Sequence, residues 1–255
     1  MSHSEYYICV CTKIADKFSR TRRYRMNIRQ QPIAARACGF GERDRRVIDP
    51  PIVVQVSLAD FDPTSASDLA ELRYPKVIQC RLQSVPWGTD VTAVSDPSNA
   101  NKLSRRLMGS LVASSMVCTD PEAPESNNPN ARLGCFFVIH DLSCRQNGLY
   151  KLQFSLMKID IENLPIGGTL PILGTLESDV FEVFSAKDFP GTRPSTALTK
   201  ALKNQGSSVS VKKGYDAKAG KKGRKRGSGG SDDSDSEGDN TSAKDGAAAP
   251  QSKRG

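Results

Sequence analysis

The residues best suited to chemistry in this 255-residue chain are arginines that gather near its N-terminus. Between positions 20 and 46 the sequence holds nine Arg and no Lys, against only Glu42 and Asp44. A guanidinium group presents a planar fork of N–H donors that matches a phosphate or a guanine edge, which an ammonium group does not. Glycines flank Phe40 and favour a loop whose backbone can approach a phosphate strand. These features predict a DNA-contacting loop over residues 36–46.

A charged loop between two strands would give the same composition without any contact to DNA. In that interpretation the arginines keep the loop soluble or face an acidic surface of another protein. The chain carries 36 Lys and Arg against 28 Asp and Glu, a net charge of +8 that fits both interpretations.

A second basic cluster lies near the C-terminus. Its members are Lys221, Lys222, Arg224, Lys225 and Arg226. A flexible chain can lay such a cluster along the acidic groove of a nuclear import receptor. The cluster therefore predicts an import signal, with a polyelectrolyte tail that strengthens DNA binding through counterion release as the alternative.

Residues that could support catalysis or bind a metal are sparse. His140 ends an apolar run, and we expect it to be a hydrogen-bonded structural residue rather than a base. Cys144 lies close by, but no glycine-rich nucleophile turn accompanies it. The sequence has no P-loop, and its seven Cys include no CxxC pair. We therefore predict that the protein is not an enzyme and needs neither cofactor nor metal.

The elements that must position these residues are mainly β-strands. Apolar and polar residues alternate with a period of two over several short runs. The clearest runs are 24–29, 52–58, 78–82, 150–156 and 181–183. Turn residues separate them, and this pattern predicts a β-sandwich. One helix is expected to begin at Ser195 as its N-cap and to end at Gly206.

Three long loops are expected, over residues 60–71, 83–102 and 119–132. The single Trp of the chain, Trp87, lies in the second of them. We expect its ring to pack against the core, with contact to a partner protein as the alternative.

The last fifty residues are too polar to form a core. Residues 206–255 contain no Leu, Ile, Phe, Trp or Met, and Tyr215 is their only aromatic residue. Such a segment cannot offset its ordering entropy by burial. We predict an N-terminal extension over 1–19, a folded domain over 20–213 and a disordered tail over 214–255. With no run of eighteen apolar residues, no membrane span is expected.

Several sequence blocks, in this order, resemble the fungal velvet family. They are RYRMNIRQQP (23–32), ARACGFGERDRR (35–46), DPPIVV (49–54), LMGSLVAS (107–114), GCFFVIHDLS (134–143), GLYKL (148–152) and FEVFSAKDFPG (181–191). The block around Phe40 is most similar to the velvet-like B branch. The resemblance implies a mainly β fold, an immunoglobulin-like β-sandwich similar to the Rel-homology DNA-binding domain, with a few peripheral helices.

The resemblance also implies a function. Velvet proteins are nuclear regulators that couple fungal development, sporulation and secondary metabolism, and they bind promoter DNA as homodimers or heterodimers. The expected partners are therefore double-stranded promoter DNA, another velvet protein and an import receptor. The expected location is the nucleus, with a cytoplasmic pool. The alternative is an interaction module that docks on another velvet regulator and does not contact DNA itself.

The resemblance places the DNA contacts in the loop after the first strand. On this sequence they fall on Arg36, Arg43, Arg45 and Arg46. Arg43, Arg45 and Arg46 would contact phosphates, and Arg36 would position the loop.

Overall fold

Strands make up most of the regular structure, which confirms the predicted mainly β class. The computed structural model describes residues 24–40, 45–96, 99–160 and 168–212. The strands are β1 (Tyr24–Gln30), β2 (Ala34–Arg36), β3 (Ile52–Leu58), β4 (Lys76–Ser84), β5 (Ala93–Asp96), β6 (Asn99–Arg105), β7 (Leu107–Met108), β8 (Val112–Ser114), β9 (Met116–Thr119), β10 (Leu133–Ile139), β11 (Ser143–Cys144), β12 (Gly148–Lys158), β13 (Ile172–Glu177) and β14 (Phe181–Phe184). The helices are α2 (Ala66–Arg73), α3 (Ala197–Asn204) and the 3-10 turn η1 (Pro129–Arg132).

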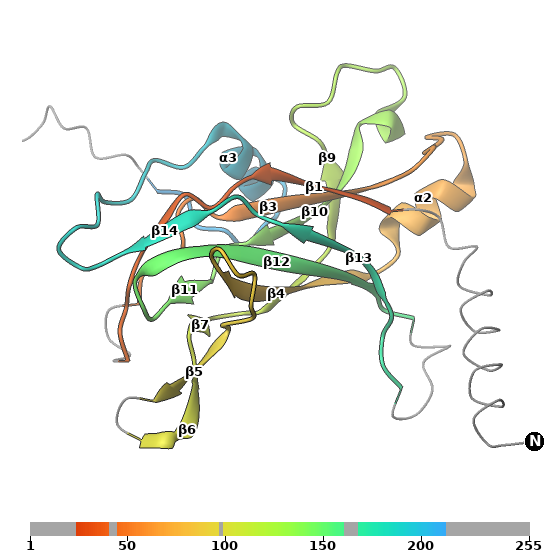
Figure 1. Ribbon diagram of the computed structural model, residues 1–255. Coiled ribbons are helices and arrows are strands. Elements are labelled where there is room, and N and C mark those ends of the chain that lie inside the picture. Colours follow the sequence, from red (N-terminus) through yellow and green to blue (C-terminus); the bar gives the residue numbers. More distant parts are fainter. Residues whose placement is uncertain (1–23, 41–44, 97–98, 161–167, 213–255) are drawn as a thin grey trace, which may run out of the picture. The chain divides into compact units, whose positions relative to one another are not determined.

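Two sheets enclose one hydrophobic core (Figure 1). One sheet has the order β1-β3-β10-β9, and the other has the order β2-β14-β12-β4-β8 with β13 also paired to β12. The strands β12 and β4 pair over a long antiparallel register, from Tyr150 opposite Ser84 to Lys158 opposite Lys76. The alternation seen in the sequence sends one side of each central strand into the core, where apolar burial stabilises the sandwich.

The helix α3 covers part of the outer face of the four-stranded sheet. Its Leu198 and Leu202 pack against Phe136 of β10. The predicted cap is one residue too early, because Thr196 is the N-cap and its hydroxyl accepts from the Thr199 N–H at 3.1 Å. The hydroxyl of Ser195 instead accepts from the backbone N–H of Lys212 at 2.9 Å. The backbone of Lys212, in the segment that follows α3, therefore binds the hydroxyl that the sequence assigned to the cap.

The expected loop over 60–71 contains most of α2. Ser65 caps this helix, accepting a hydrogen bond from the Asp68 N–H at 3.3 Å. At the other end the buried Lys76 ammonium donates to the carbonyls of Glu71 (2.6 Å) and Tyr74 (2.9 Å). Burial lowers the pKa of Lys76. No helix in the described ranges is long and apolar enough to cross a membrane.

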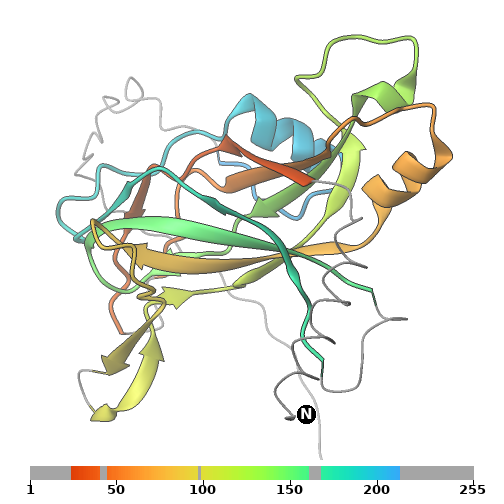
Figure 2. The same cartoon turned by 45° about the vertical axis from the view of Figure 1, so that its right-hand side comes forward.

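The expected loop over 83–102 forms a tight turn and the β5–β6 hairpin, which extends away from the two sheets in both views (Figures 1 and 2). Trp87 lies on the turn and is 82% exposed, so the prediction that it packs against the core is wrong. The reason is the turn itself. The Gly88 N–H donates to the Ser84 carbonyl at 2.9 Å, and the Ser84 N–H donates to the Thr89 carbonyl at 2.9 Å. This closed turn points the ring outward.

The predicted tail over 214–255 and the predicted extension over 1–19 lie outside the described residues.

Candidate nucleic-acid interface

A short segment after β10 supports the predicted arginine loop. We call residues 141–145 the anchor segment and residues 37–48 the arginine loop. The middle of the anchor segment is β11, which pairs with β7 through Ser143 opposite Met108. Its three central residues are all buried, so the segment has a fixed position at the end of the sandwich.

The first end of the arginine loop runs along the anchor segment. The N–H of Cys38 donates to the Cys144 carbonyl at 3.0 Å, and the N–H of Gly39 donates to the Arg145 carbonyl at 3.0 Å. Gly39 has a φ of 63°, a left-handed conformation that glycine adopts without strain. The loop is therefore tied down up to the residue at which its backbone turns.

The second end of the loop is held by Arg45. Its Nε donates to the Ser143 hydroxyl at 2.7 Å, and its Nη2 donates to the Asp141 carboxylate at 2.7 Å and to the Asp141 carbonyl. The backbone N–H of Ile48 donates to the Leu142 carbonyl at 2.7 Å. Both ends of the loop thus rest on the same five residues, which fixes the spacing between them.

Gly109 makes room for this second attachment. Its φ is 101°, and a Cβ at this position would overlap the Asp141 carbonyl oxygen and Nη2 of Arg45. The chain can pass beside the ion pair only because the residue is glycine. The sequence block that contains Gly109 therefore leaves room for the attachment of Arg45, although the block and the loop are more than sixty positions apart.

The described structure locates three of the four predicted contact residues. Arg45 and Arg46 are exposed at the second end of the loop, and Arg36 is half-buried at the end of β2. Arg43 lies outside the described residues. So does the whole predicted import signal: Lys221, Lys222, Arg224, Lys225 and Arg226.

Of two further arginines that the sequence analysis did not select, Arg145 contacts the loop and Arg105 contacts Arg145 through its backbone carbonyl. Arg145 donates from Nε to the Arg105 carbonyl (2.9 Å) and from Nη1 to the Gly39 carbonyl (2.9 Å). Its guanidinium lies 5.2 Å from the centre of the Phe40 ring. Arg105 ends β6 and is exposed. Only the pairing of β7 with β11 brings these residues to the loop, so no local motif could have revealed them.

The charges of these arginines are compensated unequally. Arg45 forms an ion pair with Asp141. Arg145 donates to carbonyl groups, and among the described residues no carboxylate pairs with it or with Arg105. The surroundings of the arginine loop therefore keep positive charge even though Arg45 itself is neutralised.

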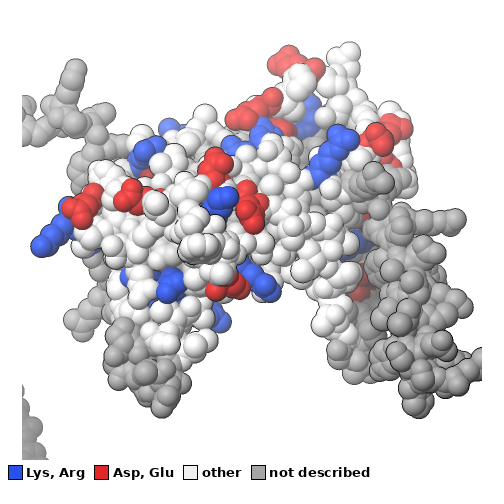
Figure 3. All heavy atoms as spheres, viewed as in Figure 1, with Lys and Arg blue, Asp and Glu red and all other residues white. Residues whose placement is uncertain are grey.

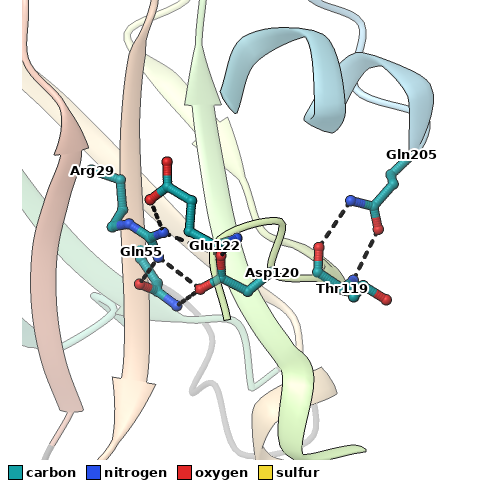
Figure 4. A network of polar contacts seen from close by, with 6 residues as sticks. All are labelled: Arg29, Gln55, Thr119, Asp120, Glu122 and Gln205. Atoms are coloured by element: carbon teal, nitrogen blue, oxygen red, sulfur yellow. Dashed lines mark hydrogen bonds and ion pairs between the residues drawn. The ribbon is translucent and has the colours of Figure 1, made fainter. Parts of the chain in front are cut away.

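Arg29 belongs to the same arginine-rich run but has a different environment (Figure 4). It lies on β1 and donates from Nη1 to Asp120 at 2.7 Å, while its Nη2 bonds to Glu122. The hydrogen bond to Asp120 is the main cause that raises the pKa of Arg29. Burial acts to raise the pKa of Asp120, but the hydrogen bonds from Arg29 hold it below its usual value. Two carboxylates thus neutralise Arg29, which leaves it poorly suited to a phosphate.

The outer face of the six-stranded sheet carries both signs of charge. On the face seen in Figure 3, basic and acidic side chains lie interspersed. Lys151 of β12 pairs with Glu177 at 3.6 Å, and Arg81 of β4 lies 3.9 Å from Asp90. A polyanion gains little from such a mixture.

His140 has the structural role that the sequence predicted for it. Its Nε2 lies 2.9 Å from the Ser208 hydroxyl, and this contact joins the end of β10 to the chain that follows α3. The imidazole therefore helps to hold the segment that follows α3 against the end of β10.

One protein-family model matches most of this chain. The model of the velvet factor matches residues 24–102 and 89–216, which is well over half of the chain. The chain belongs to the velvet family. This confirms the resemblance seen in the sequence blocks.

Individual velvet relatives agree with the family match. The sexual development regulator VELC of Pyricularia oryzae is 45% identical over 195 residues, which are 76% of this chain and 42% of the relative. The spore development regulator vosA of Beauveria bassiana is 43% identical over 210 residues, which are 82% of this chain and 71% of the relative. Velvet complex subunit 2 of Botryotinia fuckeliana is 38% identical over 142 residues, 51% and 29% of the two chains.

The chain spans less than half the length of VELC. The names of these velvet relatives describe regulators of development, which confirms the prediction that the chain is not an enzyme.

Proposed function

We propose that this velvet protein is a sequence-specific DNA-binding transcription regulator of fungal development, sporulation and secondary metabolism. The observation that carries the proposal is an arginine-rich loop attached at both ends to the anchor segment, with uncompensated arginines beside it. An attached loop loses less conformational entropy when it binds, and positive charges without carboxylate partners attract phosphates. The names of the relatives, which describe regulators of sexual and spore development, support the developmental role.

The arginines of the loop have distinct roles in this proposal. Arg43 and Arg46 contact phosphates and the edges of bases. Arg45 uses Nε and Nη2 on the anchor segment and offers Nη1 to a phosphate. Arg36 positions the loop where β2 ends.

The proposed partners follow from the family. The protein pairs with itself or with another velvet protein, and one relative is named as a subunit of a velvet complex. The basic cluster between Lys221 and Arg226 binds an import receptor, which takes the protein from a cytoplasmic pool into the nucleus.

A second candidate function is an interaction module that docks on another velvet regulator and leaves the DNA contact to that partner. The ion pair between Arg45 and Asp141 favours this alternative, because it makes the arginine loop less positive than its sequence suggests.

Binding to duplex DNA of random sequence, measured across a salt series, separates the two functions. We expect the logarithm of the affinity of the full chain to fall linearly with the logarithm of the salt concentration. Replacing Arg43, Arg45 and Arg46 together with Ala should weaken binding and flatten this slope by about one for each phosphate that the loop no longer neutralises. If the unaltered chain does not bind DNA, the interaction module is the correct function.

A matched control removes three arginines at the opposite end of the sandwich. The first, Arg25, lies near the start of β1. The second, Arg73, lies in α2, which follows β3, and the third, Arg132, lies in η1, which precedes β10. These ends of the three strands are far from the loop and the anchor segment. Replacing these three with Ala changes the net charge equally and should leave the salt slope close to that of the unaltered chain. An equal loss in both variants would mean that DNA responds to net charge alone and not to the arginine loop.

A further inference from the structure

We propose that Arg105 and Arg145 form a second phosphate-binding row of this protein, at the base of the β5–β6 hairpin. This inference rests on the proposed DNA-binding function and extends its site beyond the arginine loop. Arg105 and Arg145 lie 57 and 97 positions after Ile48, the last residue of the loop.

The guanidinium of Arg145 is held in place before any ligand arrives. Two hydrogen bonds of 2.9 Å fix its Nε and Nη1 to the carbonyls of Arg105 and Gly39. The ring of Phe40 lies against it, with 5.2 Å between guanidinium carbon and ring centre. A long side chain that is already ordered loses little entropy when it contacts a phosphate, and Nη2 is the nitrogen left for that contact.

The positive charge of this row has no acidic partner in the described part of the chain. Two arginines of the N-terminal run are paired instead: Arg29 with Asp120 at 2.7 Å, and Arg45 with Asp141 at 2.7 Å. Arg145 bonds to neutral carbonyls instead, and the exposed Arg105 has no described carboxylate beside it. Unpaired positive charges beside a basic loop repel one another in the free protein, and a polyanion that spans them removes this repulsion.

The position of Arg145 connects the row to the loop. Its backbone N–H donates to the Arg106 carbonyl at 2.9 Å, and its backbone carbonyl accepts from the Gly39 N–H at 3.0 Å. Arg145 therefore lies between the first end of the arginine loop and the base of the hairpin. Figures 1 and 2 show β5 and β6 extending from the same end of the sheets as β7 and β11. A duplex that contacts the loop can extend along this row, because its phosphates repeat at short intervals.

The neighbouring Arg106 is not part of the phosphate-binding row, because its guanidinium has other contacts. Its Nε donates to the Gln146 side chain at 2.8 Å, and its Nη1 donates to the Val91 carbonyl at 3.3 Å. Burial is the main cause that raises the pKa of the Cys144 thiol to about 11, and the charge of Arg106 acts in the opposite direction. This guanidinium is directed into the strand ends, so we do not include it in the row.

The test measures binding to a pool of random-sequence duplex DNA across a salt series, with the full chain and single Gln variants. We expect Arg105→Gln and Arg145→Gln each to weaken binding several-fold at low salt and to flatten the salt slope by about one. The control Arg25→Gln removes the same charge from the exposed side of β1 and should leave the slope unchanged.

Arg105→Gln is the decisive variant, because the side chain of Arg105 makes no hydrogen bond to the described residues and its loss leaves the loop attachments intact. Arg145→Lys keeps the charge but loses the planar fork, so it should keep most of the slope that Arg145→Gln loses. Thermal unfolding followed by circular dichroism verifies that each variant is folded.

The outcomes separate this inference from the proposed function. The row is overturned if folded Arg105→Gln binds with the unaltered slope while the loop variant at Arg43, Arg45 and Arg46 still loses its slope; the DNA-binding function then stands. A loss confined to Arg145→Gln also overturns the row, because a single residue would account for it. If the unaltered chain does not bind DNA, the function and the row fail together.

Discussion

Arg29 and Arg45 come from one arginine-rich run, and each meets an aspartate more than ninety positions later in the chain. Arg29 joins β1 to Asp120 after β9, and the two side chains are 13% and 11% exposed. Arg45 joins the arginine loop to Asp141, and these side chains are 31% and 42% exposed. The first pair also includes Glu122, so carboxylates outnumber the guanidinium there. The second pair lies next to other arginines.

This difference shows that a run of arginines in a sequence is not one site. Strand alternation sends Arg29 to the outer face of a sheet, where Asp120 and Glu122, from the segment that follows β9, neutralise it. The loop takes Arg45 to the end of the sandwich, where its ion pair fixes the backbone and leaves other positive charges in place. One pair therefore joins β1 to the segment that follows β9, whereas the other positions the arginine loop.

The largest effect that tests this comparison is expected at Gly109. Gly109→Ala places a Cβ against the Asp141 carbonyl and the Arg45 guanidinium, in a backbone conformation that alanine rarely adopts. We expect a loss of about 3 kcal/mol in unfolding free energy from strain and overlap together, measured by urea unfolding. DNA binding should weaken as well, because the second end of the loop is displaced.

Gly191→Ala is the control for this change. Gly191 has a φ of 100° but has nothing within 4 Å of the added Cβ, so only backbone strain remains. It should cost about 1 kcal/mol. Equal losses at the two glycines would mean that the contact with Asp141 and Arg45 is unimportant.

A smaller effect is expected at the partly buried pair of Arg29 and Asp120. Asp120→Asn removes the charge that faces Arg29 and should lower the unfolding free energy by about 2 kcal/mol at neutral pH, less than for a fully buried pair because Glu122 remains. The salt slope of DNA binding should not change. A variant that weakened DNA binding without loss of stability would contradict the separation between the two pairs.

The pH dependence provides an internal control for Asp120→Asn. The folded-state pKa of Asp120 lies below its usual value, so its contribution is complete above the unfolded-state pKa of about 4 and is lost as pH falls toward the folded-state pKa. The difference in unfolding free energy between the wild type and the variant should therefore shrink below about pH 4. A difference that stayed constant there would point to packing instead of charge.

The smallest effect on stability is expected at the exposed pair. Asp141→Asn keeps an oxygen that can accept from Arg45 but removes the negative charge. Stability should change by less than about 0.5 kcal/mol. DNA binding should tighten, and its salt slope should steepen by up to about one, because Arg45 is no longer neutralised. Weaker binding by this variant would show that the charge of Asp141 helps DNA contact instead of opposing it.

The sandwich could be predicted from the sequence because its central strands alternate strongly. Leu152, Phe154 and Leu156 of β12 are all buried, as their period of two requires. The helix α2 was missed because it has little apolar periodicity and buries only Asp68 and Leu72. Its one local signal was the cap at Ser65, which by itself does not distinguish a helix from a turn.

The candidate site was predictable only where it depends on local sequence. The loop itself is local, so its composition revealed it between two strands. Strand pairing across the end of the sandwich brings the anchor segment, Gly109 and Arg145 to the site. A local sequence pattern does not predict which strands will pair. The prediction for Trp87 failed because the tendency of aromatic rings to be buried was overridden by the geometry of a closed turn.

The exposed turn at Trp87 has a practical consequence for spectroscopy. The chain has one Trp, and its indole ring is already surrounded by water in the folded protein. Intrinsic Trp fluorescence should therefore change little when the sandwich unfolds and is a poor monitor of its stability. The same property makes it a low-background reporter, since an emission shift on mixing with DNA or with a second protein would mark a contact at this turn.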